Sequence, residues 1–191
     1  MRAEARIFYF DTVNNNRRML EWRLHLLKCK DILNAVVIDS EKAEELGRVK
    51  DIIFDPGERK AVALLVSNKN QPFSSLWIDF GFIKEFSDVI LLSLNAEIVL
   101  LSEVKDGKKK LKENSVKKLW GLKVVDGSGK LLGTLEDLYF NVPDGKLEGI
   151  ELSLGIVSDL YNGRKFISVE DIKVFGKDAL LLNDTVNLEG K

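Results

Sequence analysis

Two aspartates at matching positions of an internal repeat are the first residues in this chain to consider for chemistry. Asp51 lies in the segment 46–55, and Asp137 lies in the segment 132–141. A pair of carboxylates can act as general acid and general base. The alternative is a structural role, in which each carboxylate accepts hydrogen bonds from nearby backbone amides or caps a turn. We favour the structural role, because the two segments share apolar positions without a larger polar constellation, and we predict no catalytic residue.

A metal site is the second chemistry that the residue types suggest. His25 and Cys29 are spaced i, i+4, and they are the only histidine and cysteine of the chain. Two ligands are too few for a structural zinc site, which takes four. Cys29 aligns with Val116 in the repeat, so we expect it to fill the core as a small apolar residue. We predict neither a metal nor a cofactor.

The glycine-rich stretch 126–133 resembles both a phosphate loop and a calcium loop. A phosphate loop leads into a helix, whereas the residues after Lys130 are typical of a strand. In a calcium loop Lys130 would put a cation among the ligands Asp126 and Ser128, and Asp137 would replace the bidentate glutamate. We therefore predict a hairpin turn here.

The most suggestive charged stretch is 102–118, which holds seven lysines against three acidic residues. The whole chain has 29 basic and 30 acidic side chains, so it lacks the overall positive charge of a dedicated nucleic-acid binder. The default interpretation is a solvated linker between domains. The alternative is contact with RNA, a ribosomal particle or anionic lipid through counterion release. The lysines concerned are Lys105, Lys108, Lys109, Lys110, Lys112, Lys117 and Lys118.

The cellular compartment is restricted by composition. A single cysteine excludes an intramolecular disulfide, which suits a reducing compartment. No apolar run approaches the ~20 residues of a membrane-spanning helix, and the short run 7–10 does not make a signal peptide. We predict a cytoplasmic protein without a transmembrane segment.

The internal repeat predicts the architecture. LGRVKDIIFD at 46–55 aligns with LGTLEDLYFN at 132–141 at an offset of 86. The offset is 86 at Ser67 and Ser153 and becomes 89 at Ile78 and Ile167, so length differences fall in loops. Each copy shows alternating apolar residues, a turn with proline and glycine, and a returning strand, which together predict a hairpin. Further apolar runs bring each copy to about five or six strands, at 77–80, 89–92, 166–169 and 179–182.

A small sheet of this kind hides its apolar face and its edges by closing into a barrel. The opening Val-Ile-Asp or Val-Val-Asp, the Leu-Gly segment, the returning strand and the last apolar strand resemble the PRC-barrel. The resemblance covers roughly 30–101 and 115–184, and its recurring positions are Gly47, Asp51, Phe54, Gly133, Asp137 and Phe140.

The resemblance implies an all-β chain of two tandem small β-barrels. We divide the chain into an N-terminal extension (1–26), a first domain (27–101), a basic linker (102–118), a second domain (119–184) and a tail (185–191). In the extension, Trp22, Leu24 and Leu26 alternate as in a strand, whereas Leu20, Leu24 and Leu27 would line a helix. Both conformations stay open.

The resemblance also implies an interaction module without catalytic residues. PRC-barrels form the cytoplasmic part of photosynthetic reaction-centre H subunits and half of a ribosome maturation factor. We therefore expect protein or ribonucleoprotein partners, with a homodimer as a further candidate. An RNA- or ribosome-associated factor acting through the lysines is one alternative. A membrane-peripheral assembly factor for a photosynthetic or respiratory complex is the other.

Overall fold

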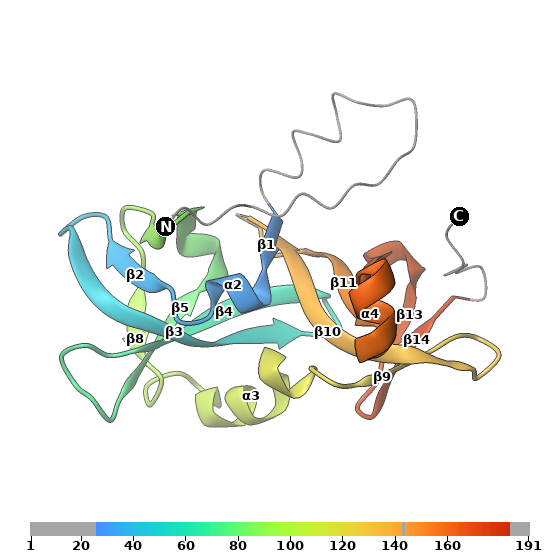
Figure 1. Ribbon diagram of the computed structural model, residues 1–191. Coiled ribbons are helices and arrows are strands. Elements are labelled where there is room, and N and C mark those ends of the chain that lie inside the picture. Colours follow the sequence, from blue (N-terminus) through green and yellow to red (C-terminus); the bar gives the residue numbers. More distant parts are fainter. Residues whose placement is uncertain (1–25, 143, 184–191) are drawn as a thin grey trace.

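The fold is mainly β and consists of two tandem domains of the same topology, as predicted (Figure 1). The structure is a computed structural model that describes residues 26–142 and 144–183. In the first domain the strands run in the hydrogen-bonded order β6-β7-β2-β3-β4-β5-β8. They are β2 (Val36–Asp39), β3 (Glu44–Asp55), β4 (Lys60–Ser67), β5 (Ser75–Asp79), β6 (Ile83–Phe86), β7 (Val89–Leu92) and β8 (Ile98–Leu100), with the 3₁₀ helix η1 (Phe80–Phe82) between β5 and β6.

The second domain repeats this order as β13-β14-β9-β10-β11-β12. Its strands are β9 (Lys123–Val125), β10 (Leu131–Asn141), β11 (Leu147–Ser153), β12 (Lys165–Ser168), β13 (Ile172–Phe175) and β14 (Ala179–Leu182), with η3 (Val169–Asp171) between β12 and β13. In both domains the last strand of the repeat lies parallel to the first, β7 beside β2 and β14 beside β9. The strand β8 takes the first domain one strand beyond the predicted number.

Long, bent strands give both domains their curvature. The first part of β3 pairs with β2 and the remainder with β4, and β10 divides its pairing between β9 and β11 in the same way. A glycine sits near each change of partner. A Cβ on Gly47 would lie 1.8 Å from the carbonyl oxygen of Ser67, and one on Gly133 would lie 2.1 Å from that of Ser153. This close approach of two backbones explains why glycine recurs at the matching position.

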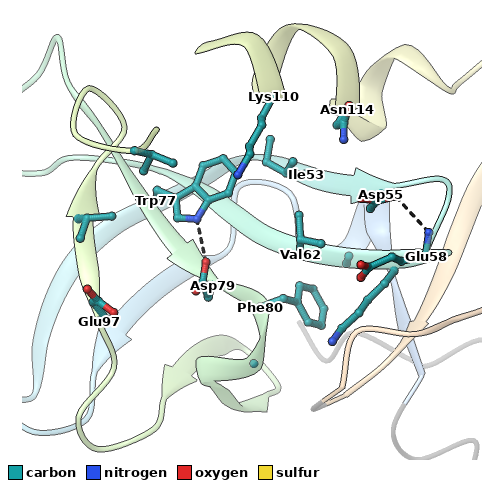
Figure 2. A pocket seen from close by; sticks show the side chains of 15 residues that line it. Ile53, Asp55, Glu58, Val62, Trp77, Asp79, Phe80, Glu97, Lys110 and Asn114 are labelled. Carbon is teal, nitrogen blue, oxygen red and sulfur yellow. Dashed lines mark hydrogen bonds between the residues drawn. The ribbon is translucent and has the colours of Figure 1, made fainter. Parts of the chain in front are cut away.

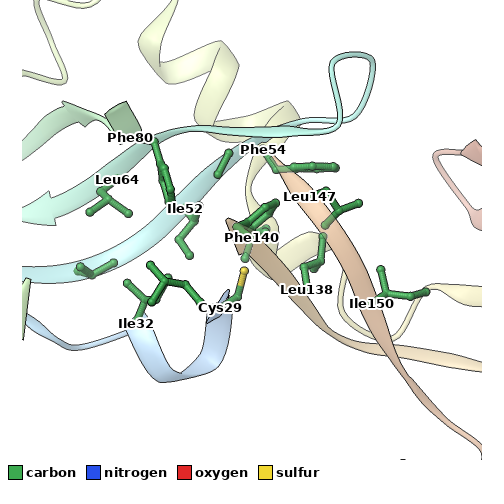
Figure 3. Packing of buried hydrophobic residues seen from close by; sticks show 14 of the residues in the cluster. Cys29, Ile32, Ile52, Phe54, Leu64, Phe80, Leu138, Phe140, Leu147 and Ile150 are labelled. Atoms are coloured by element: carbon green, nitrogen blue, oxygen red, sulfur yellow. The ribbon is translucent and has the colours of Figure 1, made fainter. Parts of the chain in front are cut away.

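One continuous apolar core joins the two domains (Figure 3). The ring centroid of Phe140 lies 5.6 Å from that of Phe54 and 6.2 Å from that of Phe80. All three side chains are almost completely buried. The two domains therefore share one hydrophobic core and are not separate units joined only by a linker.

The segment before each domain packs against the other domain. The strand β1 (Leu26–Lys28) pairs with β10, and the short helix α2 (Cys29–Ile32) follows it. In the same way, Ser115 bridges to Ile53 of β3, directly before the 3₁₀ helix η2 (Val116–Lys118). Cys29 and Val116 are fully buried at equivalent places, as predicted for a small apolar filler.

The remaining helices are α3 (Gly107–Asn114) and α4 (Ile156–Asn162), neither of which the sequence predicted. The stretch 102–118 stays a predicted linker: its seven lysines are exposed, while Leu111 of α3 packs with Val104 on apolar residues of the first domain. Leu26 and Leu27 belong to a strand, while Leu20, Trp22 and Leu24 lie outside the described residues. No helix within the described ranges is long and apolar enough to cross a membrane.

Candidate functional site

Asp51 and Asp137 each join a long strand to a crossing segment. Asp51 accepts hydrogen bonds from the next residue's amide (2.8 Å) and from the hydroxyl of Ser115 (2.6 Å). Asp137 accepts them from the next residue's amide (2.9 Å) and from the amide of Lys30 (3.2 Å). Both aspartates are buried. Each carboxylate thus binds the segment that crosses to it, as in the structural role expected from the sequence.

Burial changes the acidity of two groups at this junction. Desolvation raises the pKa of the Asp137 carboxyl to about 6, although the amide hydrogen bonds from Leu138 and Lys30 oppose it. Burial also raises the pKa of the Cys29 thiol well above its usual range, and the charge of Asp137 adds to this effect. Cys29 is therefore a protonated core residue, not a thiolate nucleophile.

The predicted turn at 126–130 is closed by its own aspartate. Asp126 accepts hydrogen bonds from the hydroxyl (2.6 Å) and amide (2.9 Å) of Ser128 and from the amide of Lys130 (2.9 Å). These bonds, first among them that of the Ser128 hydroxyl, hold the pKa of Asp126 below its usual value. The strand β10 follows, so the hairpin turn is confirmed.

Metal ligands do not gather in the described part of the chain. Within residues 26–142 and 144–183, no group of three or more His, Cys, Asp and Glu side chains is placed to hold an ion. His25 lies outside these residues.

The lysines of the basic stretch divide into two sets. All seven are exposed. The ammonium of Lys110 lies over the ring of Trp77, 5.8 Å from its centroid, and is drawn toward the first domain. The ammonium of Lys118 donates a hydrogen bond to the carbonyl of Lys112. We call the other set the lysine surface: Lys105, Lys108, Lys109, Lys112, Lys117 and Lys118.

A pocket of about 620 Å³ lies between α3 and the outer face of the first domain (Figure 2). Its apolar wall includes Trp77, whose indole N–H donates a 2.8 Å hydrogen bond to Asp79. The sequence does not predict this pocket, because its residues come from several strands and from a helix that is far away in the chain. Its charged side chains are Asp55, Glu58, Lys60, Asp79, Glu97 and Lys110.

The equivalent face of the second domain carries a buried ion-pair network instead. Glu151, 4% exposed, forms ion pairs with Lys28 (3.0 Å) and Arg164 (3.3 Å) and accepts a hydrogen bond from the hydroxyl of Tyr139. Burial and the charge of Glu151 raise the pKa of Tyr139 well above its usual value. The network fastens β1 to the second domain, and nothing local in the sequence indicated it.

The helix α4 exposes its large apolar side chains. Ile156, Val157, Leu160 and Tyr161 are 82, 70, 79 and 85% exposed. We call these four residues the α4 apolar surface. It was not predicted, yet a signal existed: the repeat offset rises from 86 to 89 across this region, which marks three extra residues in the second copy.

The fold and these contacts define a class, the tandem small β-barrel proteins in which two copies of one domain pack together. The sequence profile of the PRC-barrel domain matches residues 25–99 and again 111–188. The chain therefore belongs to the PRC-barrel family and carries two of its domains. A search of curated protein sequences returns no match. The boundaries drawn from the sequence at 26, 101, 118 and 184 stay predictions.

Proposed function

We propose that this chain is a non-enzymatic interaction module whose partner-binding site is the α4 apolar surface. The observation that carries the proposal is the exposure of four large apolar side chains on one seven-residue helix. Contiguous exposed apolar groups usually mark an interaction site. The first domain reaches β5 from β4 without a helix, so α4 is an addition that the barrel itself does not require.

The chemistry of α4 favours an apolar groove on a partner protein. Asp159, the only charged residue of α4, is turned inward and accepts hydrogen bonds from the hydroxyl of Ser153 (2.6 Å) and the amide of Leu154 (2.9 Å). Arg164, just beyond the helix, is held by Glu136 and Glu151. The exposed side of α4 thus offers apolar contact and little charge, which suits a helix-in-groove complex better than a polyanion.

The test compares an Ile156→Ser/Leu160→Ser variant with the wild type and with Phe73→Ser. Phe73 is fully exposed on the first domain and serves as the matched control. Partners captured from a nuclease-treated lysate of the source organism are identified, purified and titrated by calorimetry. We expect at least one to bind the wild type and Phe73→Ser equally and the α4 variant at least about tenfold more weakly, since truncating central apolar anchors costs 1–2 kcal/mol or more.

A second copy of the chain or an anionic membrane could also occupy the α4 apolar surface, and each is detected by its own measurement. Sedimentation equilibrium of the wild type and the α4 variant detects a homodimer, and flotation with anionic vesicles detects a membrane-peripheral role. If Ile156 and Leu160 are needed for self-association or for vesicle binding, and not for binding of any partner protein, the partner-protein assignment is overturned. Partners that bind the α4 variant as well as the wild type would also overturn it.

The lysine surface favours a second candidate function, RNA or ribosome association. Its six lysines are exposed, and Lys108, Lys109 and Lys112 lie on α3. Phosphate contacts give an affinity that falls steeply with salt. Neutralising Lys108, Lys109 and Lys112 with glutamine should flatten the salt dependence of binding to single-stranded RNA, whereas Lys177→Gln should not. Salt-independent binding would contradict this function.

A further inference from the structure

The pocket of the first domain has a size and a charge that point to a particular ligand class. Its volume of about 620 Å³ falls in the range of small-molecule sites. Four carboxylates line it against two ammonium groups, so the lining has a net charge of −2 when Asp55, Glu58, Asp79 and Glu97 are set against Lys60 and Lys110. The pocket therefore favours a cation.

Trp77 supplies an aromatic wall that already holds an ammonium group. Its side chain is fixed by burial and by the hydrogen bond from its N–H to Asp79. The ammonium of Lys110 lies 5.8 Å from the ring centroid, within the range of cation–π attraction. In Figure 2, Lys110 reaches the indole from α3, Asp79 lies at the edge of the indole that carries the N–H, and Glu97 lies farther from the ring. The position of Lys110 thus shows that the ring of Trp77 can bind an ammonium group.

A comparison with the second domain indicates that this resident cation is weakly held. There Lys28 lies over the ring of Tyr139 at the same distance, 5.8 Å, but Lys28 also pairs with the buried Glu151 at 3.0 Å. In the repeat, Leu65 takes the place of Glu151. Among residues 26–142 and 144–183, Lys110 forms no ion pair. A competing cation needs only to replace one contact with the ring.

We propose that this pocket binds an organic cation, a primary ammonium or a guanidinium group, which displaces Lys110 from Trp77 and is held by Asp79 and Glu97. The cation is either a free amine or a lysine or arginine side chain of a protein. The site lies on the first domain and is independent of the α4 apolar surface, so either proposal can fail without the other.

The test is an NMR titration of the full chain that follows the indole N–H of Trp77, assigned with Trp77→Phe. The probe is 1,5-diaminopentane, and 1,5-pentanediol is its uncharged control. We expect a saturable shift with the diamine and none with the diol. Asp79→Asn and Glu97→Gln should each weaken binding about threefold, as for exposed ion pairs, while Glu85→Gln, outside the pocket, should not.

Lys110→Ala separates displacement from simple addition. If Lys110 competes for the ring, its removal tightens diamine binding about threefold; a loss of binding would overturn the displacement. Blocked lysine and blocked arginine, used as further probes, distinguish the sources, because a protein-side-chain site binds them more tightly than the diamine. A shift that stays linear to 50 mM, or that the diol reproduces, would overturn the proposal.

Discussion

Lys60 and Lys146 occupy equivalent positions in the two domains and form an antiparallel β-bridge with each other. On either side of this bridge the amide of Ala61 donates to the carbonyl of Gly145 (2.8 Å), and the amide of Leu147 donates to the carbonyl of Arg59 (2.9 Å). These two hydrogen bonds exchange under the repeat offset of 86. Such reciprocity is the mark of a two-fold contact, so the chain is an intramolecular pseudo-dimer.

The first prediction concerns the shared core. Phe140→Ala removes the ring that touches both Phe54 and Phe80, and we expect it to lower the free energy of unfolding by about 3–5 kcal/mol. Urea denaturation followed by circular dichroism measures this loss. Val174→Ala, at a 48% exposed position, should change stability by less than about 0.5 kcal/mol. Both proteins should unfold in one transition, and two separate transitions would contradict a shared core.

The second prediction concerns the close approach of β10 to β11. In Gly133→Ala the new Cβ would meet the carbonyl oxygen of Ser153, so the two strands must separate, and we expect a loss of at least about 2 kcal/mol. Gly81→Ala is the matched control, because a Cβ there meets nothing within 4 Å. Thermal unfolding of both variants provides the comparison. Equal melting temperatures would show that the backbone contact is not tight.

The third prediction concerns pH. The pKa of Asp137 is about 6 in the folded protein and 3.8 without the fold, so between these values the folded state binds more protons. Its contribution to stability is complete below pH 3.8 and is lost as the pH rises through 6, with a slope of at most about 1.4 kcal/mol per pH unit. Between pH 4 and 6.5, the slope of the free energy of unfolding against pH should be less negative in Asp137→Asn than in the wild type.

Asp126→Asn is the control for this experiment. The pKa of Asp126 is lowered, so above pH 5 its carboxyl is ionised in both the folded and the unfolded state. The stability profile above pH 5 should therefore keep its slope in Asp126→Asn. If Asp137→Asn also left the slope unchanged, the raised pKa of Asp137 would be wrong.

The fourth prediction concerns the side chain of Arg59, which crosses between the domains. Its guanidinium donates to the carbonyls of Ile172 (2.7 Å), Val169 (3.1 Å) and Lys173 (3.3 Å) in the second domain. Its backbone has a φ of 51°. Arg59→Asn tolerates this φ but removes all three hydrogen bonds, which should lower the free energy of unfolding in urea by about 1.5–3 kcal/mol. Arg48→Asn removes one exposed bond within the first domain and should cost less. If Arg59→Asn left the free energy of unfolding unchanged, the side chain would not hold the two domains together.

Much of the fold was predictable from residues that repeat at a fixed offset. The alternating apolar residues of 46–55 and 132–141 and the turns with proline and glycine predict strands and hairpins, and the structure has them at β3, β4, β10 and β11. Cys29 could be assigned to the core because it aligned with Val116. These patterns are local or repeat-wide, so a single sequence reveals them.

The surfaces were less predictable. The exposed faces of α3 and α4 lie where the two copies differ, and there the repeat carries no information. The lysines of α3 were recognised by their number, but the inward turn of Lys110 toward Trp77 depends on how Leu111 packs on the domain below.

The linear pattern of apolar residues, turns and glycines determined that this chain forms two barrels of one kind, because that pattern acts between neighbours in a strand or hairpin. The linear pattern does not determine which segment covers which barrel. Lys28 meets Glu151 across 123 residues, and Ser115 meets Asp51 across 64. These pairings arise only when the chain folds into its tertiary structure, because burial brings together residues that no sequence spacing relates.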